Sequence, residues 1–385
     1  MKDKTAIVGI GQTEFTRWGQ TTRASEFQLA LEACIAACAD AGIEVKDVDG
    51  FVAYSIDRNG PMQVARALGV RQVRFANLYP GGGNSVAGIV HNAAMAVFSG
   101  TADAVLCYRS ICQGQFGRLG KSTAAGSFAG YAAFTGPAGV TNPAQYYAMQ
   151  IRRYMEEYGV TSRQLAAVAL ASYKHAQRNP RATMYGRPIT IEDHQASRLV
   201  ADPYHLYDCC QESDGACAVL VTRAARATNC RHRPVYIVSA AQGGSGFDPV
   251  IGGLLYGQWN TAGFVDTARD LYTRAEMGPK DIDVAQFYEN FTGQTLMAIE
   301  DFGFAPRGEG GKWIEGGRIE WPDGELPINT SGGNLAEAYI HGLELMLEGV
   351  RQMRGDSTCQ VKDAETCLVV SGPSAPPSSA MILRR

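Results

Sequence analysis

Short apolar runs of strand length alternate with longer helix-like stretches along this chain. Runs of strand length, each bounded by turn residues, occur at positions 5–9, 102–108, 216–221, 234–239 and 364–370. Two longer segments, 85–98 and 335–353, are rich in apolar residues and long enough to be buried helices. Because strands that alternate with helices are typical of βαβ units, the pattern predicts an α/β fold with largely parallel sheets.

The same order of elements occurs twice. The segment KDVDGFVAY at 46–54 is similar to KDIDVAQFY at 280–288, and each predicts a turn that leads into a buried strand. A glycine-rich turn follows in each case, GGGN at 81–84 and SGGN at 331–334, and each turn opens an apolar helix. We therefore predict that the fold is built from two duplicated halves.

The two predicted halves span residues 1–232 and 233–385, and the first carries an insert at about 112–203. The insert begins with a Gly-, Ala-, Ser- and Thr-rich stretch at 114–139, which predicts a long loop. Two helices are expected after it, at 142–158 and 161–177, the second with Thr161 as its N-cap.

Composition excludes several classes of protein. The 385 residues include 35 Lys and Arg against 38 Asp and Glu, a net charge of −3, which argues against binding to nucleic acid or anionic lipid. No apolar run approaches the roughly 20 residues of a membrane span. Ten cysteines lie mostly in apolar runs and form no Cys-x-x-Cys. We therefore expect a reduced, cytoplasmic protein without disulfides or a metal site.

Two apparent nucleotide motifs fail on inspection. The segment from Gly9 to Glu14 begins like a dinucleotide fingerprint, but a carboxylate stands where the third glycine should be. The segment 114–122 resembles a phosphate-binding loop, yet five residues instead of four separate its glycines. Neither segment supports a nucleotide-binding function.

Two further motifs carry a family resemblance. The segments DCCQESDGA at 208–216 and INTSGG at 328–333, together with the duplicated order, resemble the thiolase superfamily and specifically its sterol-carrier-protein-X-like branch. The resemblance covers essentially the whole chain. It implies a five-layer α-β-α-β-α sandwich in which two sheets enclose a central layer of helices.

The residues that thiolases use for acyl transfer are missing. The position of the thiolase nucleophile, a Cys at the start of the buried N-terminal helix, matches about Gly83. Tyr339 aligns with the histidine of the thiolase Gly-His-Pro motif, and Tyr288 aligns with the other catalytic His or Asn. The late acid/base Cys is absent near 370–372. This pattern resembles the thiolase-like aldolases that remove steroid side chains.

The resemblance implies retro-aldol cleavage of a β-hydroxyacyl-CoA by a lyase whose acid/base pair is Tyr288 and Tyr339. We expect Tyr288 to be the base and Tyr339 the proton donor or orienting partner, although the roles could be exchanged. Backbone N–H groups of the two glycine turns could face the thioester oxygen. No cofactor is expected besides the coenzyme A of the substrate. The residues expected to bind substrate are Gly83, Asn290, Asn329, Gly332, Gly333 and His341.

Further expectations concern neighbouring groups and partners. Glu289 is expected to be a solvated turn or structural residue, and His341 to face a different side of its helix from Tyr339. The resemblance implies a homodimer core that binds a zinc-ribbon/OB-fold subunit to form a heterotetramer. Basic residues in the insert are candidates for the phosphates of coenzyme A: Arg118, Lys121, Arg152, Arg153, Lys174 and Arg178.

Two other functions stay open from the sequence alone. The chain could be a divergent thiolase or acyltransferase that uses another cysteine, with Cys107, Cys112 and Cys367 near strand ends. It could also be a non-catalytic subunit that binds an acyl-CoA and supports a partner.

Overall fold

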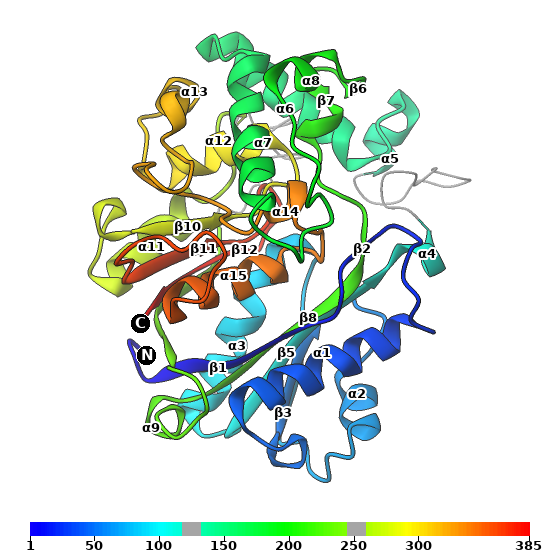
Figure 1. Ribbon diagram of the computed structural model, residues 1–385, viewed down its shortest axis with the longest axis vertical. Helices are drawn as coiled ribbons and strands as arrows, with labels where there is room; N and C mark the ends of the chain where they lie inside the picture. The colour runs from blue at the N-terminus through cyan, green and yellow to red at the C-terminus, as the bar shows by residue number, and fades with distance from the viewer. Residues whose placement is uncertain (118–131, 245–258) are drawn as a thin grey trace.

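The computed structural model describes residues 1–117, 132–244 and 259–385. Its main sheet has ten strands in the order β10-β11-β12-β9-β1-β8-β5-β3-β4, with β2 paired to β8 (Figure 1). These strands are β1 (Thr5–Gln12), β2 (Thr16–Arg17), β3 (Gly50–Tyr54), β4 (Phe75–Tyr79), β5 (Ala104–Cys112), β8 (Ser213–Arg223), β9 (Val235–Gly243), β10 (Val284–Phe287), β11 (Thr366–Val370) and β12 (Ser378–Arg384).

The duplicated order is present in this sheet. In the first half β3 pairs with β5 in parallel, and β5, β8 and β1 then pair antiparallel. In the second half β10, β11, β12 and β9 repeat those pairings. β1 and β9 join the halves. The expectation of largely parallel sheets was wrong, because the short connection from Val370 to Ser378 allows only an antiparallel neighbour.

Helices form three layers around the two halves of the sheet. α1 (Glu26–Ala41) packs on the outer face of β1, β5 and β8, and α11 (Val265–Ala275) packs on β9 and β12. Between the halves lie α3 (Val86–Ser99) and α15 (Leu343–Arg354), which contact strands of both (Figure 1). The layers therefore follow the expected α-β-α-β-α order.

The glycines of the rejected dinucleotide fingerprint serve packing. A Cβ at Gly9 would lie 2.1 Å from the Ala37 carbonyl oxygen, and one at Gly11 would lie 2.1 Å from that of Ala33. Both oxygens belong to α1, so only glycine allows this helix to approach β1 so closely.

The insert lies over the second half of the sheet. Helices α6 (Pro143–Tyr158) and α7 (Ser162–Ala176) occur where they were predicted, and α7 is capped by Thr161 as expected. α7 packs against α12 (Thr292–Asp301). The described residues of the predicted loop at 114–139 include two short α-helices and a 3-10 helix at Gly136–Ala138, and residues 118–131 lie outside the described residues. The other elements are α2 (Pro61–Ala67), α4 (Gln113–Phe116), α5 (Ala132–Thr135), α8 (Ile191–Ala196), α9 (Ala224–Ala227), α13 (Gly310–Trp313), β6 (Leu199–Ala201) and β7 (Tyr204–His205).

In the described segments of the chain, no helix is both long and apolar enough to cross a membrane.

The helix predicted at 335–353 is interrupted. α14 (Gly333–Ala336) ends after one turn, residues 337–342 form a loop, and α15 begins at Leu343. His341 has φ +50° and Gly342 has φ +81°, and these left-handed conformations cannot continue a right-handed helix. The loop carries both Tyr339 and His341 and thereby shapes the candidate site.

Candidate active site

Two tyrosine hydroxyls meet where the second sheet half ends. Tyr288 follows β10, and its hydroxyl donates a hydrogen bond of 2.7 Å to the hydroxyl oxygen of Tyr339. The rings meet edge to face, with centroids 6.0 Å apart. The side chains that sequence analysis paired are therefore in direct contact.

The strand that carries Tyr288 is held by the asparagine of the INTSGG motif. The Asn329 side chain accepts from the Phe287 N–H at 2.8 Å and donates to the Phe287 carbonyl at 2.9 Å. The Tyr288 N–H donates to the Val370 carbonyl at 3.1 Å. Asn329 is fully buried and bonds both polar groups of the Phe287 backbone, so it positions Tyr288. Its expected part in substrate binding stays a prediction.

The loop at 337–342 is fixed by buried polar groups. The Tyr339 N–H donates to the Ser213 hydroxyl at 3.1 Å, and the Ile340 N–H donates to the Glu344 carboxylate at 3.2 Å. Glu344 also accepts a hydrogen bond from the Asn334 side chain. The Tyr54 hydroxyl donates to the His341 carbonyl at 3.2 Å. These contacts, from both halves of the chain, give Tyr339 one position.

The glycine turn of the first half lies against Tyr288. A Cβ at Gly83 would lie 2.2 Å from both Cζ and the hydroxyl oxygen of Tyr288, so no side chain fits there. The Gly83 carbonyl accepts from the Gly372 N–H at 2.8 Å. The position that matches the thiolase nucleophile is therefore occupied by the tyrosine ring.

The backbone donors of the glycine turns are already used. The N–H of Gly81 donates to the Ser55 hydroxyl at 2.9 Å, and that of Gly82 donates to the Asn84 side chain at 2.9 Å. The Gly332 N–H donates to the Asn329 carbonyl at 2.9 Å. The expectation that these turns offer free N–H groups to a thioester was therefore wrong at these three positions.

Glu289 is fully buried, so the expectation of a solvated turn residue was wrong, while a structural role fits. A Cβ added at Gly333 would lie 1.8 Å from Oε1 of Glu289, which explains the second glycine of the motif. Burial raises the pKa of Glu289 to about 8, opposed by hydrogen bonds from backbone N–H groups, including that of Asn334, and from the Asn329 side chain. Glu289 is thus mostly protonated at pH 7.

Four side chains retain a little exposure and mark the opening of the site. Tyr288, Asn290, Tyr339 and His341 are between 5% and 9% exposed. The His341 ring lies edge-on to that of Tyr339, with centroids 5.1 Å apart. The expectation that His341 faces away from Tyr339 was wrong, because the two residues lie in a loop and not in a helix.

The DCCQ motif joins this opening to the first half. The Cys210 N–H donates to the Asn290 carbonyl at 3.0 Å, and the Gln211 N–H donates to the Asn334 carbonyl at 2.9 Å. The Asn290 side chain accepts from the Phe291 N–H at 3.1 Å. The two motifs that carried the resemblance therefore both lie beside the tyrosine pair.

Burial keeps both hydroxyls protonated in the free chain. It raises the pKa of Tyr288 well above the usual value, as do the neighbouring Tyr339 and the hydrogen bond that Tyr288 donates to it. Burial also raises the pKa of Tyr339 well above the usual value, but the hydrogen bond from Tyr288 opposes that rise. Of the two, Tyr339 is the hydroxyl whose anion would be stabilised by its neighbour.

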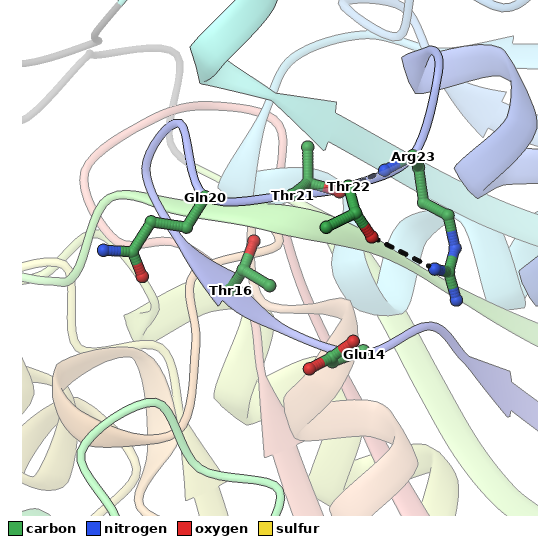
Figure 2. Close-up of a pocket in the computed structure, with 6 residues that line it drawn as sticks. All are labelled: Glu14, Thr16, Gln20, Thr21, Thr22 and Arg23. Atoms are coloured by element: carbon green, nitrogen blue, oxygen red, sulfur yellow. Dashed lines mark hydrogen bonds between the residues drawn. The ribbon is translucent and has the colours of Figure 1, made fainter.

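A separate surface depression has no part in this site. It is lined by residues around β2, among them Glu14, Gln20 and Arg23 (Figure 2). Its volume of about 60 Å³ admits only a few water molecules.

Similarity to known proteins identifies the family of this chain. The profile described as "Thiolase C-terminal domain-like" matches residues 257–385. A 17-hydroxy-3-oxo-4-pregnene-20-carboxyl-CoA lyase of Mycobacterium tuberculosis is 42% identical over 99% of this chain and 100% of its own. A steroid side-chain-cleaving aldolase of Thermomonospora curvata is 42% identical over 98% of this chain and 97% of its own. The chain belongs to the thiolase superfamily, in the group of the steroid side-chain-cleaving aldolases.

A solved structure supports this membership. The structure titled "Ltp2-ChsH2(DUF35) aldolase" superimposes with a TM-score of 0.92 at 41% identity, over 100% of this chain and 98% of that one. The thiolase-like fold expected from the sequence is confirmed.

The three cysteines considered as alternative nucleophiles lie in unsuitable environments. Cys107 and Cys367 are completely buried, and burial raises the pKa of each thiol far from the range of a nucleophile. Burial also raises the pKa of Cys112, which is 1% exposed. These environments argue against the divergent-thiolase alternative.

The candidate phosphate-binding residues gain no support. Arg152 forms an ion pair with Asp202, Arg153 pairs with Glu157 at 3.6 Å, and Lys174 pairs with Glu320 at 2.5 Å. Arg178 lies 6.0 Å from the ring centre of Trp321. Arg118 and Lys121 lie outside the described residues. Among the residues that are described, no group of three or more His, Cys, Asp or Glu could hold a metal ion.

The close contact between Gly83 and Tyr288 predicts that a larger residue at position 83 destabilises the fold. Gly83→Ala should force the Tyr288 ring to move and lower the free energy of unfolding by about 1–3 kcal/mol, the usual cost of overpacking. Chemical denaturation measures this. Gly60→Ala is the matched control, because its Cβ meets nothing within 4 Å. A change at Gly83 no larger than that of the control would contradict the close packing.

The raised pKa of Glu289 predicts how the stability of the fold depends on pH. Since its folded pKa of about 8 exceeds its unfolded value, Glu289 contributes stability at low pH that is lost as the pH rises toward 8. Glu289→Gln removes this pH dependence. The free energy of unfolding of the variant should therefore rise relative to that of the wild type by about 1.4 kcal/mol per pH unit between roughly pH 5 and 8. Urea titrations at several pH values measure the difference. Exposed Glu156→Gln is the control, and a pH-independent difference would mean that Glu289 is ionised at neutral pH.

Proposed function

We propose that this chain is a lyase that cleaves a β-hydroxyacyl-CoA thioester by a retro-aldol reaction. The observation that carries the proposal is the hydrogen bond of 2.7 Å between Tyr288 and Tyr339, at positions where thiolases hold their catalytic histidine and its partner. The ring of Tyr288 also fills the place of the thiolase nucleophile beside Gly83. Acid–base chemistry is thus available where acyl transfer is not.

The reaction needs only proton transfers and an electron sink. A base removes the proton of the β-hydroxyl, the bond between the α- and β-carbons breaks, and its electron pair moves into the thioester as an enolate. A proton donor then protonates the α-carbon. The products are a carbonyl compound and a shorter acyl-CoA. Because the thioester itself accepts the electrons, we expect no cofactor besides the coenzyme A of the substrate.

The hydrogen-bond direction favours one assignment of roles. Tyr288 donates to Tyr339, so removal of the proton from Tyr339 leaves an anion that Tyr288 stabilises. Tyr339 is also the more exposed of the two, at 9% against 5%. We therefore assign Tyr339, acting in its deprotonated form, as the base and Tyr288 as the donor that stabilises this anion. This assignment exchanges the roles first expected from the sequence.

The substrate class follows from the relatives. One is named for cleavage of 17-hydroxy-3-oxo-4-pregnene-20-carboxyl-CoA and another for cleavage of steroid side chains. We propose a steroid thioester with a β-hydroxyl group as the substrate of this chain, so that the carbonyl product is a steroid.

The assembly we propose is a homodimer core with a second type of subunit, giving a heterotetramer. β4 lies at the end of the main sheet and pairs with β3 alone, and Leu78 on it is 47% exposed. An open edge of this kind is suited to a second copy. The two-part title of the aldolase structure supports a further subunit. We expect this partner to be the zinc-ribbon/OB-fold protein, and any zinc to belong to it.

A cytoplasmic location is part of the proposal. All ten cysteines are free, and Cys34, Cys38, Cys107, Cys217 and Cys367 are among those fully buried in the core. Free thiols in this number are typical of a reducing compartment.

Tyrosine substitutions test the function. In the chain co-expressed with a DUF35-type partner, Tyr288→Phe and Tyr339→Phe should each lower kcat by about 10²-fold or more, as expected for lost acid–base catalysis. Release of the shorter acyl-CoA from a β-hydroxyacyl-CoA steroid measures turnover. Tyr272→Phe, which removes a hydroxyl bonded to the Phe302 carbonyl, is the matched control. Normal cleavage by both variants would make the tyrosines structural, and binding without cleavage by the wild-type complex would favour a non-catalytic subunit.

A further inference from the structure

One ring nitrogen of His341 is engaged by a buried arginine. Nδ1 of His341 lies 3.0 Å from Nε and 2.9 Å from Nη2 of Arg109. Arg109 is itself held by Asp57, with a distance of 3.0 Å between Nη1 and the carboxylate. The Asp57 carboxylate also accepts from the Ser110 N–H at 2.7 Å and the Asn59 N–H at 2.9 Å. The arginine is therefore fixed from both sides.

This contact sets the protonation state of His341. A guanidinium has only donors, so Nδ1 must be the acceptor and carries no proton. The ring is then neutral, with its proton on Nε2. Burial lowers the pKa of His341 well below its usual value, and the charge of Arg109 lowers it further.

The protonated nitrogen faces the site. A Cβ at Gly82 would lie 3.8 Å from Nε2 of His341, so this edge of the ring borders the glycine turn next to Gly83. Among residues 1–117, 132–244 and 259–385, no group forms a hydrogen bond with Nε2, and His341 is 6% exposed. A donor without a partner therefore stands at the opening beside Tyr339.

We propose that the Nε2–H of His341 is a fixed, neutral hydrogen-bond donor to the thioester oxygen of the substrate, and that Arg109 is the positioning residue that locks this tautomer. The proposal rests on the proposed function. Negative charge develops on that oxygen when the carbon–carbon bond breaks, and a preorganised donor stabilises it. The glycine-turn N–H groups of Gly81, Gly82 and Gly332 are already bonded, so His341 supplies a donor that they do not.

The Arg109–His341 arrangement also favours a strong donor. The guanidinium withdraws electron density from Nδ1 and makes the proton on Nε2 a better donor, while the ring itself remains uncharged. A neutral donor stabilises the enolate without protonating its oxygen. The proton needed at the α-carbon then comes from the tyrosine pair.

The first test measures the tautomer. In the full chain labelled with ¹⁵N-histidine, the His341 ring, identified by its loss in His341→Gln, should show an unprotonated Nδ1 and a protonated Nε2 from about pH 5.5 to 8.5. Arg109→Met should abolish this fixed state. Arg354→Met is the matched control, because Arg354 also has a buried side chain and pairs with Asp40 at 2.8 Å. A protonated Nδ1, or titration of the wild-type ring within this range, would overturn the proposal.

The second test measures binding and rate. Propionyl-CoA added to the chain and its partner should shift the Nε2–H resonance of His341, and no shift at saturation would overturn the proposal. His341→Leu should lower kcat by about 10²-fold or more with KM changed less than about threefold. His341→Gln, which keeps an N–H donor, should recover at least about tenfold of this loss. If His341→Leu cleaves as the wild type does, the donor role is wrong.

The two proposals fail separately. If the wild-type complex cleaves no β-hydroxyacyl-CoA, the proposed function is wrong, while the tautomer and the propionyl-CoA shift still decide whether His341 is a locked donor to a thioester.

Discussion

The contact between the Tyr288 and Tyr339 hydroxyls depends on a break at residues 337–342. The sequence pattern predicts an unbroken helix over this segment. In a continuous helix, Tyr339 and His341 would lie about 200° apart around the axis. The left-handed conformations of His341 and Gly342 turn these residues into a loop, and both rings then border one opening. In an unbroken helix, Tyr339 and His341 could not both face the Tyr288 side chain and its surroundings.

The loop persists because its polar groups are buried and paired. Glu344 and Ser213 accept from its backbone, and Tyr54 donates to it. Each of these groups would cost about 1–3 kcal/mol if left buried without a partner, so alternative loop conformations are unfavourable. A base and a donor held in this way lose little entropy when substrate binds, which is the condition for efficient acid–base catalysis. The shape of the site is therefore set by hydrogen bonds of buried residues.

The sequence predicted most of the fold and paired two tyrosines that are in contact, but it did not predict the state of the neighbouring groups. The repeat of KDVDGFVAY and KDIDVAQFY correctly placed the buried strands β3 and β10, because the apolar pattern reflects burial. The break at 337–342 was missed, since His341 gives no local signal of a positive φ. The burial of Glu289 was misjudged, and the contact of Asn329 with the Phe287 backbone was missed, because both depend on partners distant in sequence.

The Arg109–His341 contact was invisible in the sequence for the same reason, because 232 residues separate its members. Retro-aldol cleavage is tested most directly by incubating a β-hydroxyacyl-CoA steroid in D₂O with the complex of this chain and its partner, without added coenzyme A. We expect a steroid carbonyl product and a shorter acyl-CoA that carries one deuterium at its α-carbon, with no acyl group left on the protein. Cleavage that requires free coenzyme A, or an acyl group found covalently on the chain, would contradict a retro-aldol reaction.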